Sequence, residues 1–545
     1  MTSPLSPTRT ATSAPRLRAV AGAAAGLLLL TACGGGTTEA ESAATPSAAA
    51  AAQAGGTLSI GITGEPGNLD PTFAATLTSV SVYNAMCEQL FNTTADGKVV
   101  PQLAAEAPTF NEDATVATIK LREGVLFADG TPFDAEAVKF SIERHKNTEG
   151  SQRTNELEAV TAVEVVDEHT VDVVLSAPIA PGAFDVIFTD RAGTVVSPTA
   201  VAEQGEAFSE APVCVGPFAF DSRIPQDSVT LVKDTNYYDA ENVLLDKVVY
   251  RVITDSNVRA TNLRAGELQV IERVATTDIA TLESDTAVEV QSSEGLGYVN
   301  LEINVANVGG ERGVIDTPLA SDPRVRRALA MSIDRDAINQ VVYNGQFAPA
   351  CGFMAPSSPL ATDATQSCLP YDPDAARDLL ESTGVDLPLQ VGVMLNQQPE
   401  TRRIGEMIQS MAAEVGFEVV LDIAESTATV ERGNKGDFEV YINSWSGRVD
   451  PDANVSLYAK STSPRSLSRF SDARADELIE TGRSGADVDA RIAAYEELHE
   501  LLQEESVHVF LVRPANLLGV RTDVTGVTMR ANGTAVPTYA GYVAE

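Results

Sequence analysis

The sequence predicts an α/β fold of two or three domains. The chain has 545 residues, and single hydrophobic cores rarely grow past about 250 to 300 residues. Short runs rich in β-branched residues alternate with helices that have clear start and stop signals. Hydrophobic residues make up 44% of the chain and charged residues 21%, which is typical of a soluble globular protein.

The first half of the chain carries strand and hairpin signals around one well-marked helix. Residues 57–63 (TLSIGIT) predict a strand, and residues 160–176 predict a hairpin, with β-branched runs on either side of Asp-Glu-His. Asp134 is a good N-cap for a helix over 135–145, and Phe133 with Val138 fits the hydrophobic staple. Residues 245–270 predict a strand, a helix and a second strand.

The second half contains the clearest helix signals. Asp322-Pro323 and Asp372-Pro373 each place an Asp N-cap before a Pro at the first helical position, so helices are predicted from both prolines. A further helix is predicted to stop at Gly416, followed by a strand over 417–423. The last long helix is predicted over about 487–505.

The N-terminus predicts export. Arg9, Arg16 and Arg18 precede an apolar run of about 12 residues, which is long enough for a signal peptide and too short to span a bilayer. Leu30-Thr31-Ala32-Cys33 follows and resembles a bacterial lipoprotein signal, which implies cleavage before Cys33 and acylation of its thiol. We therefore expect a protein exported to the outer face of the cytoplasmic membrane and held there by lipid alone.

The net charge argues against one class of partner, and the cysteine count indicates the compartment in which the protein functions. Acidic residues outnumber basic ones 76 to 38, so nucleic acid is not an expected partner. Four further cysteines (Cys87, Cys214, Cys351 and Cys368) fit disulfides in an oxidising compartment. Three pairings are possible; a Cys351–Cys368 bridge would close a Pro-rich loop and leave Cys87 with Cys214. A metal site is the weaker interpretation, because no CxxC pair or adjacent His supports one.

Motifs typical of catalysis are missing from the sequence. The four histidines, at positions 145, 169, 499 and 508, do not form HExxH, and we find no GxSxG, Walker or GxGxxG motif. Pairs of acidic residues are common in a chain this acidic, so they do not indicate a catalytic site. These observations lower the expectation of an enzyme, and no cofactor is predicted.

Several separated segments resemble one protein family. They are EPGNLDP (65–71), the KLR…DGTP stretch (117–141), CVGPF (214–218), residues 236–270 and residues 322–338. These segments resemble the solute-binding proteins of bacterial peptide-type ABC importers, known as family 5, which includes dipeptide-, oligopeptide-, nickel- and opine-binding members. The chain departs from the family pattern at Cys214, Val215 and Gln269, where Gly, Thr and Asp are usual.

The resemblance implies a two-lobed α/β protein of the periplasmic-binding-protein type that closes on its ligand like a hinged trap. An additional α/β domain is expected to be inserted in the first lobe. The expected layout is a signal peptide (1–32), a flexible tether (33–56), lobe I (57–95, 211–300 and 515–545), an extra domain (96–210) and lobe II (301–514). Two crossings near 299–304 and 512–516 would form the hinge, and a ligand that contacts both lobes would stabilise the closed state.

The resemblance also implies a function and its partners. We expect a monomer that captures a peptide or peptide-like solute by lobe closure and delivers it to an ABC permease and ATPase complex. The alternatives are an extracellular sensor or enzyme on the same scaffold, or a protein that binds a nickel chelate.

The segment NSWSGRVDPD (443–452), which contains the only Trp, is the expected ligand site. In the family's peptide binders the corresponding segment reads Trp, two residues, then an Asp that pairs with the peptide amine; here Arg448 stands in that position. An Arg suits a carboxylate and repels an ammonium group, which favours a ligand with an acidic group. The other interpretation is that Asp450 pairs with Arg448 as a structural lock. The candidate ligand-binding residues are Asn304, Gln397, Asn443, Trp445, Ser446, Gly447, Arg448 and Asp450.

Overall fold

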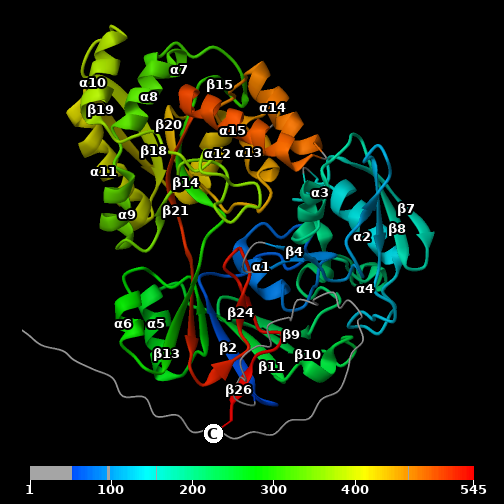
Figure 1. Cartoon of the computed structure of the whole chain (residues 1–545). Helices are drawn as coiled ribbons and strands as arrows, with labels where there is room; N and C mark the ends of the chain where they lie inside the picture. Colours follow the sequence, from blue (N-terminus) through cyan, green and yellow to red (C-terminus); the bar gives the residue numbers. More distant parts are fainter. Residues whose placement is uncertain (1–51, 95–97, 155, 464, 486, 545) are drawn as a thin grey trace, which may run out of the picture. The chain divides into compact units, whose positions relative to one another are not determined.

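Two large β-sheets, each accompanied by helices, organise the chain (Figure 1). The computed structural model describes residues 52–94, 98–154, 156–463, 465–485 and 487–544. The predicted signal peptide, Cys33 and most of the predicted tether lie outside these residues. The predicted tether ends at Gly56, yet Ala52–Gln53 already form strand β1, which pairs with β26 (Gly541–Val543).

The first large sheet has seven strands and mixes parallel with antiparallel pairing. In spatial order its strands are β13 (Val288–Ser293), β22 (Asn516–Arg521), β12 (Val270–Glu272), β2 (Thr57–Ile62), β11 (Lys247–Val252), β10 (Ser228–Lys233) and β9 (Phe218–Ile224). β2 runs parallel to both β11 and β12, which α5 (Ser256–Ala265) connects. Asp255 caps the start of α5, and Gly266 ends it in the left-handed region. The predicted strand, helix and strand unit is thus confirmed.

A smaller antiparallel sheet lies inside the segment expected to form the extra domain. Its order is β5 (Thr109–Phe110), β6 (Val116–Lys120), β8 (Thr170–Leu175) and β7 (Val160–Asp167), and its helices are α2 (Ala135–Asn147), α3 (Pro181–Ile187) and α4 (Pro198–Gln204). The predicted 160–176 hairpin is β7 with β8, and Asp134 caps α2 as predicted. Apolar residues of this sheet and of the seven-stranded sheet belong to one continuous core. We call the two sheets with this core lobe I.

The second large sheet has six strands and a core of its own. In spatial order its strands are β17 (Ala348–Pro349), β21 (His508–Arg513), β14 (Tyr298–Ile303), β20 (Val440–Trp445), β18 (Leu389–Asn396) and β19 (Phe417–Ala424). The helices packed in this core include α8 (Pro323–Met331), α9 (Arg335–Tyr343), α10 (Pro373–Ser382) and α11 (Pro399–Val415). We call this sheet with its helices lobe II. Asp322 and Asp372 cap α8 and α10, and α11 ends at Gly416, as predicted.

Lobe II continues in a helical group beside its sheet (Figure 1). The group contains α13 (Asp452–Ala459), α14 (Ala473–Ser484) and α15 (Val488–Glu505), the predicted last helix. The remaining α-helices of the described residues are α1 (Leu77–Tyr83), α6 (Ile279–Glu283), α7 (Pro318–Ser321) and α12 (Ser426–Lys435). The remaining short strands are β3 (Phe91–Thr93), β4 (Val99–Pro101), β15 (Asn307–Val308), β16 (Glu311–Arg312), β23 (Val524–Thr525), β24 (Thr528–Met529) and β25 (Ala535–Val536).

The chain changes from one large sheet to the other at two tight crossings. β13 leads to β14 through residues 294–297, a few residues earlier than expected, and β21 leads to β22 through Pro514 and Ala515. A Cβ atom on Gly295 would lie 1.8 Å from the Pro514 carbonyl oxygen, so the two crossings touch backbone to backbone. Only glycine fits at position 295 without moving one of the crossings.

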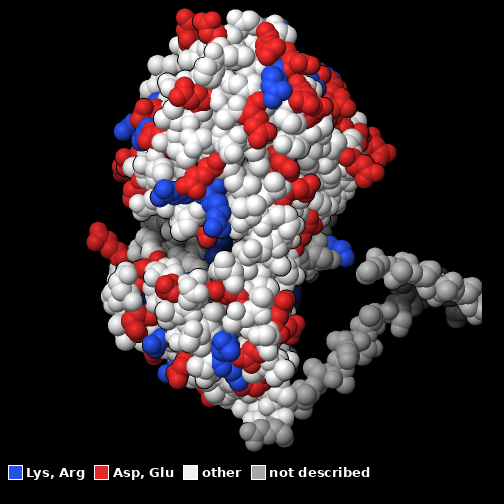
Figure 2. All heavy atoms as spheres, turned by 90° about the vertical axis from the view of Figure 1, so that its left-hand side faces the viewer, with Lys and Arg blue, Asp and Glu red and all other residues white. Residues whose placement is uncertain are grey.

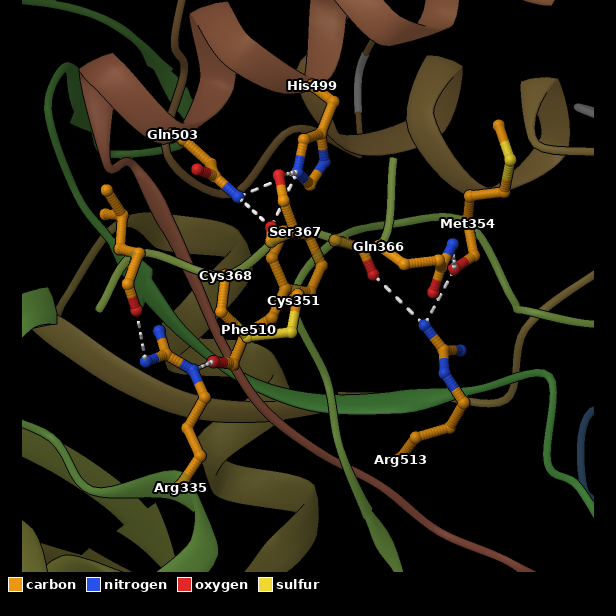
Figure 3. The surroundings of a disulfide bond; sticks show 12 residues. Arg335, Cys351, Met354, Gln366, Ser367, Cys368, His499, Gln503, Phe510 and Arg513 are labelled. Atoms are coloured by element: carbon orange, nitrogen blue, oxygen red, sulfur yellow. Dashed lines mark hydrogen bonds between the residues drawn. A yellow bond between two sulfur atoms is a disulfide. The ribbon is translucent and has the colours of Figure 1, made fainter. Parts of the chain in front are cut away.

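Two disulfides join the four described cysteines, Cys87 to Cys214 and Cys351 to Cys368. The second closes a loop beside the crossings (Figure 3). Arg513, which is 3% exposed, donates to the carbonyl oxygens of Leu296 and Gly297 and to those of Gly352 and Met354. One buried guanidinium group therefore ties both crossings to the disulfide-closed loop.

Candidate functional site

The segment around Trp445 lies where β20 ends. β14 runs antiparallel to β20 and places Tyr298 opposite Trp445, next to the first crossing. β18 runs parallel to β20 on the other side and pairs Met394 with Tyr441, so Asn396 and Asn443 both follow at the carboxyl ends of adjacent strands. Ligand sites in α/β proteins commonly form at this edge of a sheet.

Asn454 holds this segment in shape. Its Oδ1 accepts from Trp445 Nε1 at 2.9 Å and from the Arg448 backbone N–H at 2.6 Å, and its Nδ2 donates to the Arg448 carbonyl oxygen at 2.7 Å. The residue is 1% exposed and belongs to α13. The sequence prediction missed Asn454, although Asp450-Pro451 is a third Asp-Pro pair at the start of a helix and could have indicated α13.

Aromatic and cationic groups gather around the Trp445 ring. The Arg448 guanidinium carbon lies 5.0 Å from the centre of the Trp445 ring, and Tyr458 meets that ring edge-on at 5.0 Å. Arg448 Nη1 also donates to Ser446 Oγ and to the Gly447 carbonyl oxygen. Arg448 is therefore held in one orientation, while its side chain keeps 22% exposure.

Gly447 packs against the first crossing, and only a residue without a side chain fits at this position. Its φ is +77°, and a Cβ atom would lie 2.1 Å from the Leu296 carbonyl carbon. Gly297 in turn approaches the Trp445 carbonyl oxygen, where a Cβ would lie 2.1 Å away. The segment and the crossing are thus in direct backbone contact.

Asp450 does not take the role of a lock on Arg448. Its carboxylate pairs with Arg491 at 2.7 Å, and both side chains are buried. Its other oxygen accepts from the Asp452 backbone N–H at 2.9 Å, at the start of α13. Asp450 is therefore paired within lobe II, and Arg448 interacts with a different carboxylate.

The group that Arg448 faces is Asp190, which comes from lobe I. Arg448 Nη2 lies 3.8 Å from Asp190 Oδ2, and Arg191 Nη2 lies 3.1 Å from the same oxygen. Tyr83 donates its hydroxyl to Asp190 Oδ1 at 3.1 Å. Burial alone would raise the pKa of Asp190, but Arg191, Arg448 and Arg153 together hold it well below its usual value. Asp190 is thus a charged carboxylate in a basic surrounding.

The other predicted residues are distributed differently. Ser446 and Asn443 lie beside Trp445, and Asn443 accepts from the Ser444 backbone N–H. Gln397 is exposed and follows the end of β18, at the same edge of the sheet. Asn304 follows the far end of β14, is 3% exposed, and donates to the carbonyl oxygens of Asn307, Gly436 and Phe438. The structure does not bring Asn304 to the group around Trp445, because β14 runs antiparallel to β20.

Within the described residues we find no group of three or more His, Cys, Asp or Glu side chains that could hold a metal ion. In the same part of the chain, none of the helices combines the length and the apolar character needed to cross a membrane.

The surface near the crossings is hollowed. Figure 2 shows a hollow between the upper and lower parts of one face, with acidic side chains spread over much of the surface. A hollow of about 240 Å³ at the crossings is lined by residues of both lobes, among them Ser293, Glu294, Phe347 and Ala515.

Comparison with known proteins decides the family. The sequence profile of the bacterial extracellular solute-binding proteins, family 5 Middle, matches residues 98–466. The chain is a family 5 solute-binding protein. The fold, the two lobes and the matched segments agree with the resemblance found in the sequence.

Individual relatives of this solute-binding protein have described ligands. The glutathione-binding protein GsiB of Shigella flexneri serotype 5b is 27% identical over 456 residues, which cover 82% of this chain and 86% of GsiB. The structure is similar to that of AgaA from A. tumefaciens R10 in complex with agropinic acid, with a TM-score of 0.76, 26% identity, and coverage of 90% of this chain and 99% of AgaA. It is also similar in fold to DppA from Helicobacter pylori in complex with the peptide STSA, with a TM-score of 0.76, 22% identity, and coverage of 90% and 99%.

Proposed function

We propose that this chain is the substrate-binding lipoprotein of an ABC importer and that it captures a peptide-like solute with an acidic group by closure of its two lobes. The observation that carries the proposal is the stacked pair of Trp445 and Arg448, which lies at the crossing between the lobes and faces lobe I. A ligand held there contacts both lobes, and such a ligand stabilises the closed state. A permease complex would then receive the closed, loaded protein.

Arg448 supports the acidic character of the ligand. A guanidinium group presents a planar fork that matches a carboxylate, and its positive charge disfavours an ammonium group. The described ligands of two similar proteins, glutathione and agropinic acid, are both acidic. A peptide-like acid therefore fits both Arg448 and the family.

Mass spectrometry of the solute that co-purifies with the protein tests the ligand class directly. Calorimetry then compares the wild-type protein with Arg448→Asp, using glutathione and the peptide STSA as probes. We expect Arg448→Asp to weaken glutathione binding at least tenfold, because a carboxylate would meet a carboxylate. Arg402→Asp, an equal charge change at a side chain 60% exposed on α11, is the control. Equal glutathione affinity in the wild-type protein and in Arg448→Asp would contradict the role of Arg448.

We further propose that Cys33 carries the lipid that holds the protein at the membrane. Cells fed a labelled fatty acid should transfer the label to the wild-type protein and not to Cys33→Ser. The variant should appear in the soluble extracellular or periplasmic fraction. Labelled Cys33→Ser protein would contradict the anchor.

A further inference from the structure

We propose that Asp190 is an internal competitor for the ligand: its carboxylate occupies Arg448 across the two lobes, and the carboxylate of a bound solute takes its place there. This inference rests on the proposed function for the identity of the competing group. The contact between Asp190 and Arg448 itself is independent of any ligand.

Asp190 is held in position by its own lobe. Tyr83 and Arg191 each lie 3.1 Å from one of its carboxylate oxygens, and both belong to lobe I. The carboxylate therefore keeps its position and its charge when Arg448 leaves. Losing Arg448 costs Asp190 one partner of several.

Arg448 is held equally well by lobe II. Trp445 supports the face of its guanidinium group, and Nη1 donates to Ser446 and Gly447. Its Nη2 meets Asp190 at 3.8 Å, which is an ion pair beyond hydrogen-bond distance. An incoming carboxylate can approach to about 2.8 Å and form the charge-assisted hydrogen bond that Asp190 does not make. The solute thus has an advantage over Asp190 at the same group.

The arginines around Asp190 provide positive charge that can also attract a second anion. Arg153, Arg191 and Arg448 all act electrostatically on Asp190, and Arg530 lies within electrostatic reach of it as well. Arg153 has a carboxylate partner of its own in Glu156. The buried Nε atoms of Arg153, Arg191 and Arg530 find no hydrogen-bond partner among the described residues. A solute carboxylate would therefore enter a field that is already favourable to it.

The segment that ends in Asp190 is also where lobe I meets lobe II. The Ala180 backbone N–H donates to the Arg483 carbonyl oxygen at 2.9 Å, and Val186 packs with Leu296 and Val449 in one apolar cluster. Separation of the lobes has to break these contacts together with the Asp190–Arg448 pair. The pair consequently helps to hold the two lobes together before any solute arrives.

A distance measurement between spin labels tests this contribution without a ligand. Suitable sites are Ile224 in lobe I, 60% exposed, and Val314 in lobe II, 93% exposed. In ligand-stripped protein, Asp190→Asn and Arg448→Gln should each raise the ratio of open to closed molecules about two- to fivefold, the range expected for a partly exposed ion pair. The double variant should show no further rise, because both changes remove the same contact. Glu203→Gln, at an exposed position on α4, removes one negative charge elsewhere in lobe I and should change nothing.

Calorimetry with glutathione tests the competition. Asp190→Asn should bind glutathione two- to fivefold more tightly than the wild-type protein, because the competitor has lost its charge. Unchanged distances in both single variants, additive changes in the double variant, or equal or weaker glutathione binding by Asp190→Asn would each overturn the proposal. If glutathione binds neither protein, the proposed ligand class loses its support, and the distances alone decide the role of Asp190.

Discussion

Asp185, on α3, is a half-buried carboxyl group whose charge is left uncompensated. One of its oxygens has no hydrogen-bond partner among the described residues, and burial raises its pKa to about 7. Five residues later, Asp190 is also partly buried, but the arginines around it lower its pKa. The pKa values of these two aspartates of one short segment thus shift in opposite directions, because only Asp190 has cations beside it.

We expect the raised pKa of Asp185 to make stability depend on pH. Its pKa is higher in the folded protein than in the unfolded chain, so the folded state binds more protons between about pH 4 and pH 7 and loses stability as the pH rises through this range. Asp185→Asn should raise the free energy of unfolding at pH 8 by roughly 1 to 3 kcal/mol. Urea unfolding at pH 5 and pH 8 measures the effect, and a gain that is equal at both pH values would contradict this explanation.

At the scale of elements, the loop after β20 and the first crossing form one backbone unit. Gly295, Gly297 and Gly447 approach backbone atoms of neighbouring segments at distances that exclude a Cβ atom. The shape of the candidate site is therefore fixed by main-chain contacts as well as by the side chains of Trp445, Arg448 and Asn454.

Gly447→Ala should show how much the site depends on this contact. The substitution adds the cost of positive φ, about 1 to 2 kcal/mol, and pushes the loop away from Leu296, which should cost about 1 to 3 kcal/mol more. We expect lower stability and a loss of ligand affinity together. Gly384→Ala is the matched control, because Gly384 has φ +78° and nothing within 4 Å of the added Cβ. Equal losses of stability in the two variants, measured by denaturant unfolding, would show that the contact with the crossing is unimportant.

At the scale of the whole molecule, the two disulfides constrain the chain over different lengths. Cys351 and Cys368 are separated by 17 residues, whereas Cys87 and Cys214 are separated by 127. The shorter bridge closes the loop to which Arg513 ties both crossings. Each bridge restricts the unfolded chain in proportion to the logarithm of the loop that it closes.

Replacing both cysteines of a bridge by alanine should lower the free energy of unfolding, and the loss should be larger for the bridge that closes the longer loop. We expect a loss of about 3 kcal/mol for Cys351 with Cys368, and of about 4 to 5 kcal/mol for Cys87 with Cys214. Denaturant unfolding of the two double variants without reductant measures both values. A larger loss from the shorter bridge would indicate that its loop supports the crossings beyond its effect on the unfolded chain.

Much of the fold could be predicted from the sequence, because the signals that set it are local. The Asp caps at positions 134, 322 and 372 mark helix starts that the structure confirms. The site depends on contacts that no local pattern contains. Asp190 is one acidic residue among 76 and gains its role only when the fold brings it to Arg448. The position of Asn304 near the expected hinge predicts a place at the site, yet the direction of β14 takes it to the far end of the sheet.

The close approach of Gly447 to the Leu296–Gly297 peptide matters for anyone who redesigns this protein as a biosensor. Changes of ligand preference should be sought in the side chains at positions 445, 446 and 448, because a library that varies Gly447 would also vary the joint between the lobes. The same contact is useful for signal output. If the lobes close as proposed, a fluorophore attached near the first crossing would report the state of the loop after β20 without being attached to that loop.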